Sequence, residues 1–301
     1  MAGVMKKGNK KAVSFIVAAV LIILAVVFKD EIKTDKTLAL DDGNIGVYFV
    51  NVGQGNCTVI QSGNKGIIID TGEKEYASTV LSFLESKGID EVEFFIATHP
   101  HSDHIGSMGT VITKTKPGDI YMPYIADKYL PTNKTYYNFL LSIDENNVKA
   151  HFISKKTELD FDSVKLTLIP PAKQIDDMNN MSLIIKAEYG SVSFLIAGDA
   201  EKKEMTSVLS ANKGFDFSAD FYLMAHHGSS TSVYETFLNK VNFKEAVISC
   251  GKDNDYGHPH EEALSYLEKY SINYYRTDEA GTVSVITDGE KCNILTEKGN
   301  K

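Results

Sequence analysis

The feature that most constrains this chain is a cluster of four potential metal ligands within six residues, His99-Pro100-His101-Ser102-Asp103-His104. An apolar run at 92–97 precedes it and has the length of a buried strand, which predicts that the cluster lies in a loop at a strand end. In an extended loop, His99 and His101 can hold one cation, while Asp103 and His104 at a helix start can hold a second. Chance enrichment is the alternative, but three of the chain's 8 histidines lie here beside an aspartate. Imidazole and carboxylate ligands predict one or two divalent ions, Zn²⁺ or Mn²⁺.

The first 29 residues differ in composition from the rest of the chain. Four lysines precede an uncharged apolar run at 12–28, which Lys29 closes. A helix of about 17 residues reaches roughly 25 Å, and flanking lysines can extend that toward a hydrocarbon core of about 30 Å. This pattern predicts a signal-anchor over residues 1–29 that spans the cell membrane once through residues 12–28, with the catalytic domain extracellular. A cleaved signal peptide, giving a secreted protein, is the alternative, although no A-x-A cleavage site follows.

The remaining chain is predicted to comprise a polar stalk at 30–44 and one folded domain at 45–301. The whole chain has a formal net charge of −9, and residues 1–29 contribute five lysines and no acid, which leaves −14 for the remainder. That remainder contains a single arginine, Arg276. Proteins that hold duplex nucleic acid usually present a basic face, so broad binding of this kind is disfavoured. Three cysteines are too few to predict a disulfide framework.

Short apolar runs of strand length recur along 45–301, with helical patterns interleaved in both halves. This order predicts an α/β fold in which two β-sheets pack together with helices outside, an αββα sandwich. Local patterns predict a continuous helix at 105–112, a strand at 181–187, and a strand at 221–225 that leads into His226 and His227. Further strands end at Asp70 and Asp199, so metal-competent residues are expected to converge at one sheet edge.

With these residues in view, the chain resembles the metallo-β-lactamase fold superfamily, and within it the hydrolase domain of ComEC-type DNA-uptake competence proteins. The resemblance covers roughly residues 45–290. It rests on eight motifs in the same order, namely Val52-Gly53-Gln54-Gly55, Ile69-Asp70-Thr71-Gly72, the His99–His104 cluster, Asn179-Asn180-Met181-Ser182-Leu183, Gly198-Asp199, His226-His227-Gly228-Ser229, Tyr256-Gly257-His258-Pro259-His260 and Tyr275-Arg276-Thr277-Asp278.

The resemblance implies two metal positions. The first site would use His99 and His101, and the second Asp103 and His104, with Asp199 bridging both and acting with Asp103 in catalysis. His227, or its neighbour His226, would complete the second site. Because a strand places alternate residues on opposite faces, we expect His227 to bind metal and His226 to lie nearer the substrate.

Three further residues receive roles through the same resemblance. Asp70 and Asn180 are expected to support the ligands by hydrogen bonds; a turn-capping Asp is the alternative for Asp70. His258 is expected to contact the substrate or leaving group, and an ordinary loop histidine is its alternative.

The sequence also departs from wider family patterns. Most two-metal members carry a histidine between the main cluster and the bridging Asp, where this chain has Asn179-Asn180, as is usual in the competence-type subgroup. The first site is therefore expected to be open-sided, weakly held or completed by water. Asn51 and Asn56 stand where the subgroup commonly has Asp, and the channel helices of the competence proteins have no counterpart.

Together these features predict a metal-dependent hydrolase, favouring a phosphodiesterase or nuclease-like enzyme that uses a metal-activated water. The expected partners are a phosphorylated substrate, either nucleic acid or an envelope polymer as in phosphorylcholine esterases, and the membrane. Cleavage of β-lactams or thioesters is less favoured because the third histidine is missing. A degenerate binding module without activity is the alternative from a different class.

Overall fold

The computed structural model of the protein describes residues 40–299. The predicted basic flank and membrane-spanning helix, and most of the predicted stalk, lie outside these residues. Among the residues that are described, no helix is both long and apolar enough to cross a membrane. The first strand begins at Ile45.

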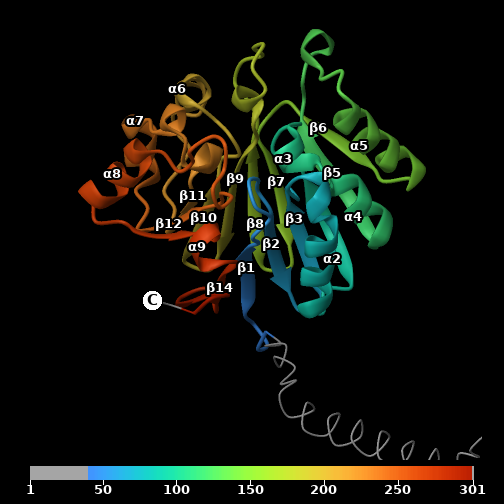
Figure 1. Ribbon diagram of the computed structural model, residues 1–301, viewed down its shortest axis with the longest axis horizontal. Helices are drawn as coiled ribbons and strands as arrows, with labels where there is room; N and C mark the ends of the chain where they lie inside the picture. Colours follow the sequence, from blue (N-terminus) through green and yellow to red (C-terminus); the bar gives the residue numbers. More distant parts are fainter. Residues whose placement is uncertain (1–39, 300–301) are drawn as a thin grey trace, which may run out of the picture. The chain divides into compact units, whose positions relative to one another are not determined.

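Two β-sheets form the centre of the described domain (Figure 1). One sheet has eight strands in the order β15 (Cys292–Thr296), β14 (Val283–Thr287), β1 (Ile45–Phe49), β2 (Thr58–Ser62), β3 (Lys65–Ile69), β4 (Glu91–Ile96), β5 (Pro117–Pro123) and β6 (Ala150–Ile153). The other has seven strands in the order β13 (Asn273–Arg276), β12 (Glu245–Ile248), β11 (Phe221–Leu223), β10 (Val192–Ile196), β9 (Ile184–Tyr189), β8 (Val164–Ile169) and β7 (Thr157–Phe161).

Helices cover the outer face of each sheet, as Figure 1 shows with the two groups on opposite sides. The eight-stranded sheet packs against helices α2 (Ala77–Ser86), α3 (Ser102–Ile105), α4 (Met108–Lys114) and α5 (Lys134–Glu145). The seven-stranded sheet packs against α6 (Lys202–Ala211), α7 (Glu235–Val241) and α8 (Glu261–Lys269). A short helix, α9 (Thr277–Ala280), follows β13. The predicted αββα sandwich is therefore confirmed for the described domain.

Side-chain alternation along the strands builds three apolar layers. In β3, Ile67 and Ile69 face the other sheet, whereas Ile68 faces the helices, and all three are fully buried. Strands covered on both faces are expected to be apolar at successive positions, which is why β1, β3 and β10 are such clear signals in the sequence.

The sequence prediction was wrong for the helix at 105–112, which is two helices, α3 and α4. The break lies at Ser107, whose backbone N–H donates to the carbonyl of Gly72 at 3.1 Å instead of to Asp103 four residues earlier. The carbonyl of Asp103 accepts from the backbone N–H of Asn56 at 3.1 Å. Contacts to neighbouring loops thus replace one helical hydrogen bond and fix the chain that follows the histidine cluster.

The strand predicted at 181–187 begins only at Ile184. Asn179–Met181 forms a short 3-10 turn instead, in which the hydroxyl of Ser182 donates to the carbonyl of Asn179 at 2.8 Å. The backbone N–H of Leu183 donates to the carbonyl of Thr98 at 2.8 Å. This turn therefore lies directly against the loop that carries the histidine cluster.

Candidate metal centre

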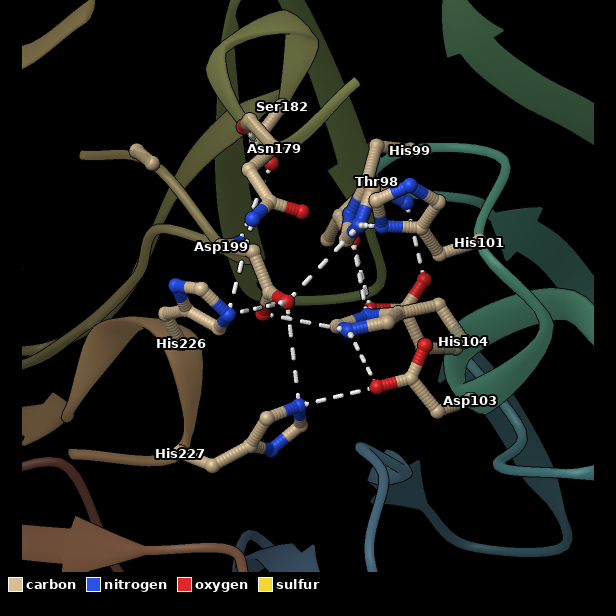
Figure 2. A network of polar contacts seen from close by, with 12 residues as sticks. Thr98, His99, His101, Asp103, His104, Asn179, Ser182, Asp199, His226 and His227 are labelled. Atoms are coloured by element: carbon tan, nitrogen blue, oxygen red, sulfur yellow. Dashed lines mark hydrogen bonds and ion pairs between the residues drawn. The ribbon is translucent and has the colours of Figure 1, made fainter. Parts of the chain in front are cut away.

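The candidate ligands come from both sheets and meet at the carboxyl ends of parallel strands. Strands β3 and β4 are parallel in one sheet, and β10, β11 and β12 are parallel in the other. Open α/β sheets characteristically bind ligands at this edge. Figure 2 shows the histidine cluster that follows β4 facing Asp199 after β10 and the His226-His227 pair after β11.

The structure brings these side chains into two groups that each can hold an ion. Atoms of Asp103, His104, Asp199 and His227 lie within 4.8 Å of one another, and so do atoms of His99, His101 and Asp199. These are the second and first sites expected from the sequence, and Asp199 belongs to both. Ligands about 2.1 Å from a tetrahedral zinc ion stand roughly 3.4 Å apart, and the distances below are on that scale.

In the second site, His104 Nε2 lies 3.1 Å from Asp199 Oδ1, and His227 Nε2 lies 3.0 Å from Asp103 Oδ2. Both His104 Nε2 and Asp199 Oδ1 are buried and lack a hydrogen-bond partner with acceptable geometry among the described residues. Buried polar atoms of this kind are rare unless something else satisfies them. An ion between these atoms would do so, and the donor set therefore fits a divalent cation.

In the first site, His99 Nε2 and His101 Nδ1 face each other at 3.0 Å, and His99 Nε2 lies 3.8 Å from Asp199 Oδ2. Burial, followed by the charge of His104, lowers the pKa of His99 well below its usual value. A neutral imidazole is the form that binds metal. Two ring nitrogens turned toward each other and a carboxylate thus offer three ligand atoms to one ion.

The electrostatics of the second site also favour a cation. Burial alone would lower the pKa of His104, but the charges of Asp199 and Asp70 raise it well above the usual value. Burial would likewise raise the pKa of Asp199, yet the charges of His104 and His227 hold it well below its usual range. A pocket that keeps a buried carboxylate ionised and stabilises positive charge beside it suits a bound cation.

Hydrogen bonds on the side of each ring away from the candidate metal positions fix which imidazole nitrogen faces the site. Asp70 Oδ2 lies 2.7 Å from His104 Nδ1, so His104 presents Nε2 to the site. Asp70 also accepts from the backbone N–H of Thr98 at 2.8 Å and from its hydroxyl at 2.6 Å. His227 Nδ1 lies 2.8 Å from the carbonyl of Ser249, which turns its Nε2 toward Asp103 and Asp199 in the same way. Such partners commonly orient metal-binding histidines.

The pair His226-His227 does not have the strand geometry that was expected from the sequence. Strand β11 ends at Leu223, and both histidines have positive φ angles, 52° and 56°. Strand alternation therefore does not apply to them, and both rings approach Asp199 Oδ2, with Nε2 at 3.8 Å for His226 and 3.7 Å for His227. Non-glycine residues in this conformation are uncommon and often mark functional sites. Only His227 belongs to the four-residue group.

The hydrogen bonds of the Asn180 side chain within residues 40–299 go to residues other than the candidate ligands. Its side-chain oxygen accepts from the backbone N–H groups of Glu201 and Glu204, at 3.3 and 3.1 Å, at the start of α6. Its nitrogen donates to Asp177 at 2.7 Å and to Glu201 at 3.0 Å. Asn180 thus anchors the helix that follows Asp199, so any support that it gives to the site acts through this backbone.

Glu204, in the first turn of α6, provides a prediction about stability. Burial raises its pKa well above the usual value, and one of its carboxyl oxygens has no hydrogen-bond partner among the described residues. A raised folded-state pKa contributes stability below the unfolded pKa that is lost as pH rises through the folded value. The loss is about 1.4 kcal/mol for each pH unit that separates the two pKa values. At pH 8 we expect the free energy of unfolding of Glu204→Gln to exceed that of the original chain. At pH 4 the two values should be nearly equal.

Chemical denaturation at several pH values, in the presence of a chelator, measures this difference. Glu262→Gln is the matched control, because Glu262 also lies in a first helical turn, in α8, but is exposed. A Glu204→Gln difference that is independent of pH would contradict the assignment of a neutral buried carboxyl group.

His258 lies at the edge of the same site and is held in one tautomer. The side-chain oxygen of Gln54 accepts from the backbone N–H of Gly251 at 3.1 Å, which leaves its amide nitrogen to face His258 Nδ1 at 3.3 Å. An amide nitrogen can only donate, so His258 Nδ1 accepts and its Nε2 carries the proton. Burial and the charges of His227 and His226 lower the pKa of His258 to about 4. His258 is therefore a neutral N–H donor at neutral pH.

A cavity of about 490 Å³ opens over the centre, and each side chain that lines it carries a polar group. His101, Asp199 and His258 contribute to its wall. Tyr256, 67% exposed, stands at its mouth with its ring stacked on that of His258.

Several residues near the centre, Gln54, Asn179 and Glu201 among them, had no individual role predicted from the sequence. Gln54 stood within a quoted motif, so a signal for it was present. No sequence signal pointed to Glu201, whose carboxylate approaches His226 Nδ1 at 3.5 Å.

One family model matches most of this chain. The family model described as the metallo-beta-lactamase superfamily matches residues 50–252. ComE operon protein 3 of Bacillus subtilis (strain 168) is 29% identical over 256 residues, covering 79% of this chain and 32% of that protein. Competence protein ComA of Neisseria gonorrhoeae is 27% identical over 248 residues, covering 81% of this chain and 33% of that protein. The chain thus spans about a third of the length of these relatives.

Among solved structures, the metallo-beta-lactamase fold protein YhfI from Bacillus subtilis aligns with a TM-score of 0.51 at 15% identity. The alignment covers 77% of this chain and 95% of that one. At this level of identity the match supports the fold alone. Together with the family match and the His and Asp groups described above, it leads to one conclusion. The chain belongs to the metallo-β-lactamase superfamily of metal-dependent hydrolases and carries a candidate site for divalent metal ions.

Proposed function

We propose that this chain is an exported, membrane-anchored hydrolase that cleaves phosphoric ester bonds, and phosphodiesters in particular. The observation that carries the proposal is the cavity over the candidate centre, in which every lining side chain carries a polar group and none is aliphatic. Pockets for drug-sized apolar ligands are lined predominantly by hydrophobic and aromatic side chains. A polar cavity above a cation site instead suits a small, strongly hydrated anionic group such as a phosphoryl group.

The residues of the site would have two kinds of role, holding the metal ions and contacting the substrate. His99, His101 and Asp199 would hold one ion, and Asp103, His104, Asp199 and His227 the other. When bound, Zn²⁺ or Mn²⁺ would supply a water of lowered pKa and stabilise the negative charge that develops on a phosphoryl oxygen. The neutral His258 directs its N–H toward an oxygen of the substrate or leaving group, and Gln54 keeps it in that tautomer.

Nucleic acid and an envelope polymer are the two substrate classes that fit this chemistry. Similarity to proteins named for competence favours nucleic acid. The exposed ring of Tyr256 at the cavity mouth offers a flat face for a base or sugar, and stacking of this kind is independent of base sequence. The net charge of −14 for residues 30–301 disfavours a long basic contact and leaves neutralisation of the phosphate to the bound ions.

A hydrolysis panel on the full chain in detergent, loaded separately with Mn²⁺ and Zn²⁺, tests this proposal. The substrates are bis-p-nitrophenyl phosphate, p-nitrophenyl phosphorylcholine, single-stranded DNA and nitrocefin. We expect the phosphodiesters to be cleaved and nitrocefin to remain intact. Cleavage of nitrocefin alone would contradict the proposal, and bound metal without hydrolysis of any substrate would favour the degenerate binding module.

His258→Ala is expected to keep both ions and to lose about a hundredfold in turnover, the scale of one hydrogen-bond donor to a developing charge. Because its pKa lies near 4, protonation of His258 should not shape the rate between pH 6 and 8. Metal content and hydrolysis rate are measured together. His151→Ala, which alters a histidine paired with Asp119 outside this cavity, is the control. Loss of an ion from His258→Ala would refute its role toward the substrate.

The proposed location rests on the lysine-flanked apolar run at 12–28. We expect the full chain to fractionate with membranes, and residues 45–301 to be accessible to external protease in cells stripped of their wall. A chain lacking residues 1–29 should lose both properties, because it lacks the proposed anchor. Recovery of the full chain from the cytosolic fraction would refute this location.

A further inference from the structure

Asn179 carries an atom that the site described so far does not explain. Its side chain lines the same cavity as His101 and Asp199. Its side-chain oxygen, Oδ1, is buried and has no hydrogen-bond partner among the described residues, whereas its side-chain nitrogen lies 3.5 Å from His226 Nε2. An unsatisfied buried amide oxygen is destabilising and is rare in folded proteins. Something other than a protein hydrogen bond is therefore expected to satisfy Asn179 Oδ1.

Neighbouring groups determine which way this amide faces. Glu201 Oε1 lies 3.5 Å from His226 Nδ1, and Thr231 Oγ1 lies 3.3 Å from the same nitrogen. Both oxygens can accept a hydrogen bond from Nδ1–H, and in that tautomer His226 Nε2 is an acceptor. Asn179 must then present its NH₂ group to His226. Its oxygen points the other way, toward His99 and His101, as Figure 2 shows.

The first site is the one that lacks a protein ligand. Among the His, Cys, Asp and Glu side chains of residues 40–299, the second site groups four residues, whereas the first groups three, His99, His101 and Asp199. An amide oxygen is a regular metal ligand in proteins and is favoured by harder ions such as Mn²⁺. We propose that Asn179 Oδ1 is the fourth protein ligand of the first site, held in that orientation by Glu201 through His226.

This inference rests on the candidate metal centre that the proposed function also uses, but not on any substrate. It adds an amide oxygen to the two imidazole nitrogens and the carboxylate oxygen that the first site was expected to use. Because an oxygen ligand then stands where a third imidazole could, the first site should favour Mn²⁺ over Zn²⁺ more strongly than a site with three histidines would. His226 is then a positioning residue for Asn179 as well as a neighbour of the substrate cavity.

Chelator-competition titration of the full chain with Mn²⁺ and with Zn²⁺ tests the proposal without any hydrolysis assay. We expect Asn179→Ala to weaken binding of the ion at the first site, the looser ion, by at least about tenfold. This is the lower range for losing even an outer partner of a metal site. The tighter ion should be unaffected. Asn179→Asp keeps the volume and adds a charge, so it should bind the looser ion at least as tightly as the original chain. Asn179→His should shift the relative affinity of that ion toward Zn²⁺.

Gln54→Ala is the matched control, because it removes another amide of this cavity, one that contacts His258 and belongs to neither group of candidate ligands, and should leave both affinities unchanged. Thermal unfolding in a chelator checks that each variant folds. Asn179→Ala with both affinities unchanged would overturn the proposal. If Asn179→Ala does not fold, weaker binding by Asn179→Asp would overturn it equally. If no phosphodiester in the hydrolysis panel is cleaved, the measured metal affinities still test the role of Asn179. The two proposals can therefore fail separately.

Discussion

Replacing Asp199 with alanine is expected to release both metal ions and to lower hydrolysis by about a thousandfold or more, at or beyond the upper range for one main transition-state contact. The reason is geometric. Asp199 is 2% exposed, and its two oxygens face different partners, with Oδ1 at 3.1 Å from His104 and Oδ2 at 3.8 Å from His99. One carboxylate thus contributes to both groups of ligands. Bound metal per chain and hydrolysis rate are measured on the same sample.

Asp119→Ala is the control for this variant, because Asp119 also contacts a histidine, His151 at 2.7 Å, but does not line the cavity. It should bind both ions normally. If Asp199→Ala retained two ions at a near-normal rate, the bridging role and the two-ion mechanism would both be wrong. Retention of one ion would show that the two sites do not depend on a shared carboxylate.

Asp103→Ala and His99→Ala are expected to remove different ions. Asp103 lies in the second site, where its Oδ2 is 3.0 Å from His227 Nε2, and His99 lies in the first. Removing Asp103 should therefore release the tighter ion, and removing His99 the looser one. Because both ions act on one reaction, each variant should lose about a hundredfold or more in turnover. Stepwise titration with a competing chelator measures which ion is lost.

The conservative variant Asp103→Asn separates charge from shape in this experiment. It keeps the volume of Asp103 but removes its charge. The ion at the second site should therefore bind more weakly, and should still occupy the site when the metal concentration is high. If Asp103→Ala and His99→Ala released the same ion, the division of the ligands into two sites would be refuted.

The sandwich was predictable from the sequence because its central strands are buried on both faces. Strands such as β3 and β10 are short runs of apolar residues, and no other local structure explains them as well. Elements with weaker signals were missed. Strand β7 (Thr157–Phe161) lies at a sheet edge and carries two acids, and helix α7 (Glu235–Val241) has only seven residues, too few to establish a helical period.

The candidate ligands were predictable because they lie within short motifs at strand ends. Their orientation was not, because it depends on contacts between segments far apart in the chain. The turn containing His226 departs from strand geometry, and the direction of Asn179 follows from Glu201, which is 22 residues away. The tautomer of His258 depends on Gln54, which is 204 residues earlier. No local pattern encodes such pairings.

The origin of the ligands in both sheets has a consequence for folding as well as for chemistry. His99 to His104 follow a strand of the eight-stranded sheet, and Asp199 and His227 follow strands of the other. A bound ion is therefore a cross-link between two halves of the chain that are separated by about a hundred residues. Binding that is confined to the folded state adds about 4 kcal/mol when the free ion is present at roughly a thousand times its dissociation constant. The local supply of metal would then influence how long the folded domain survives heat, chelators and proteases.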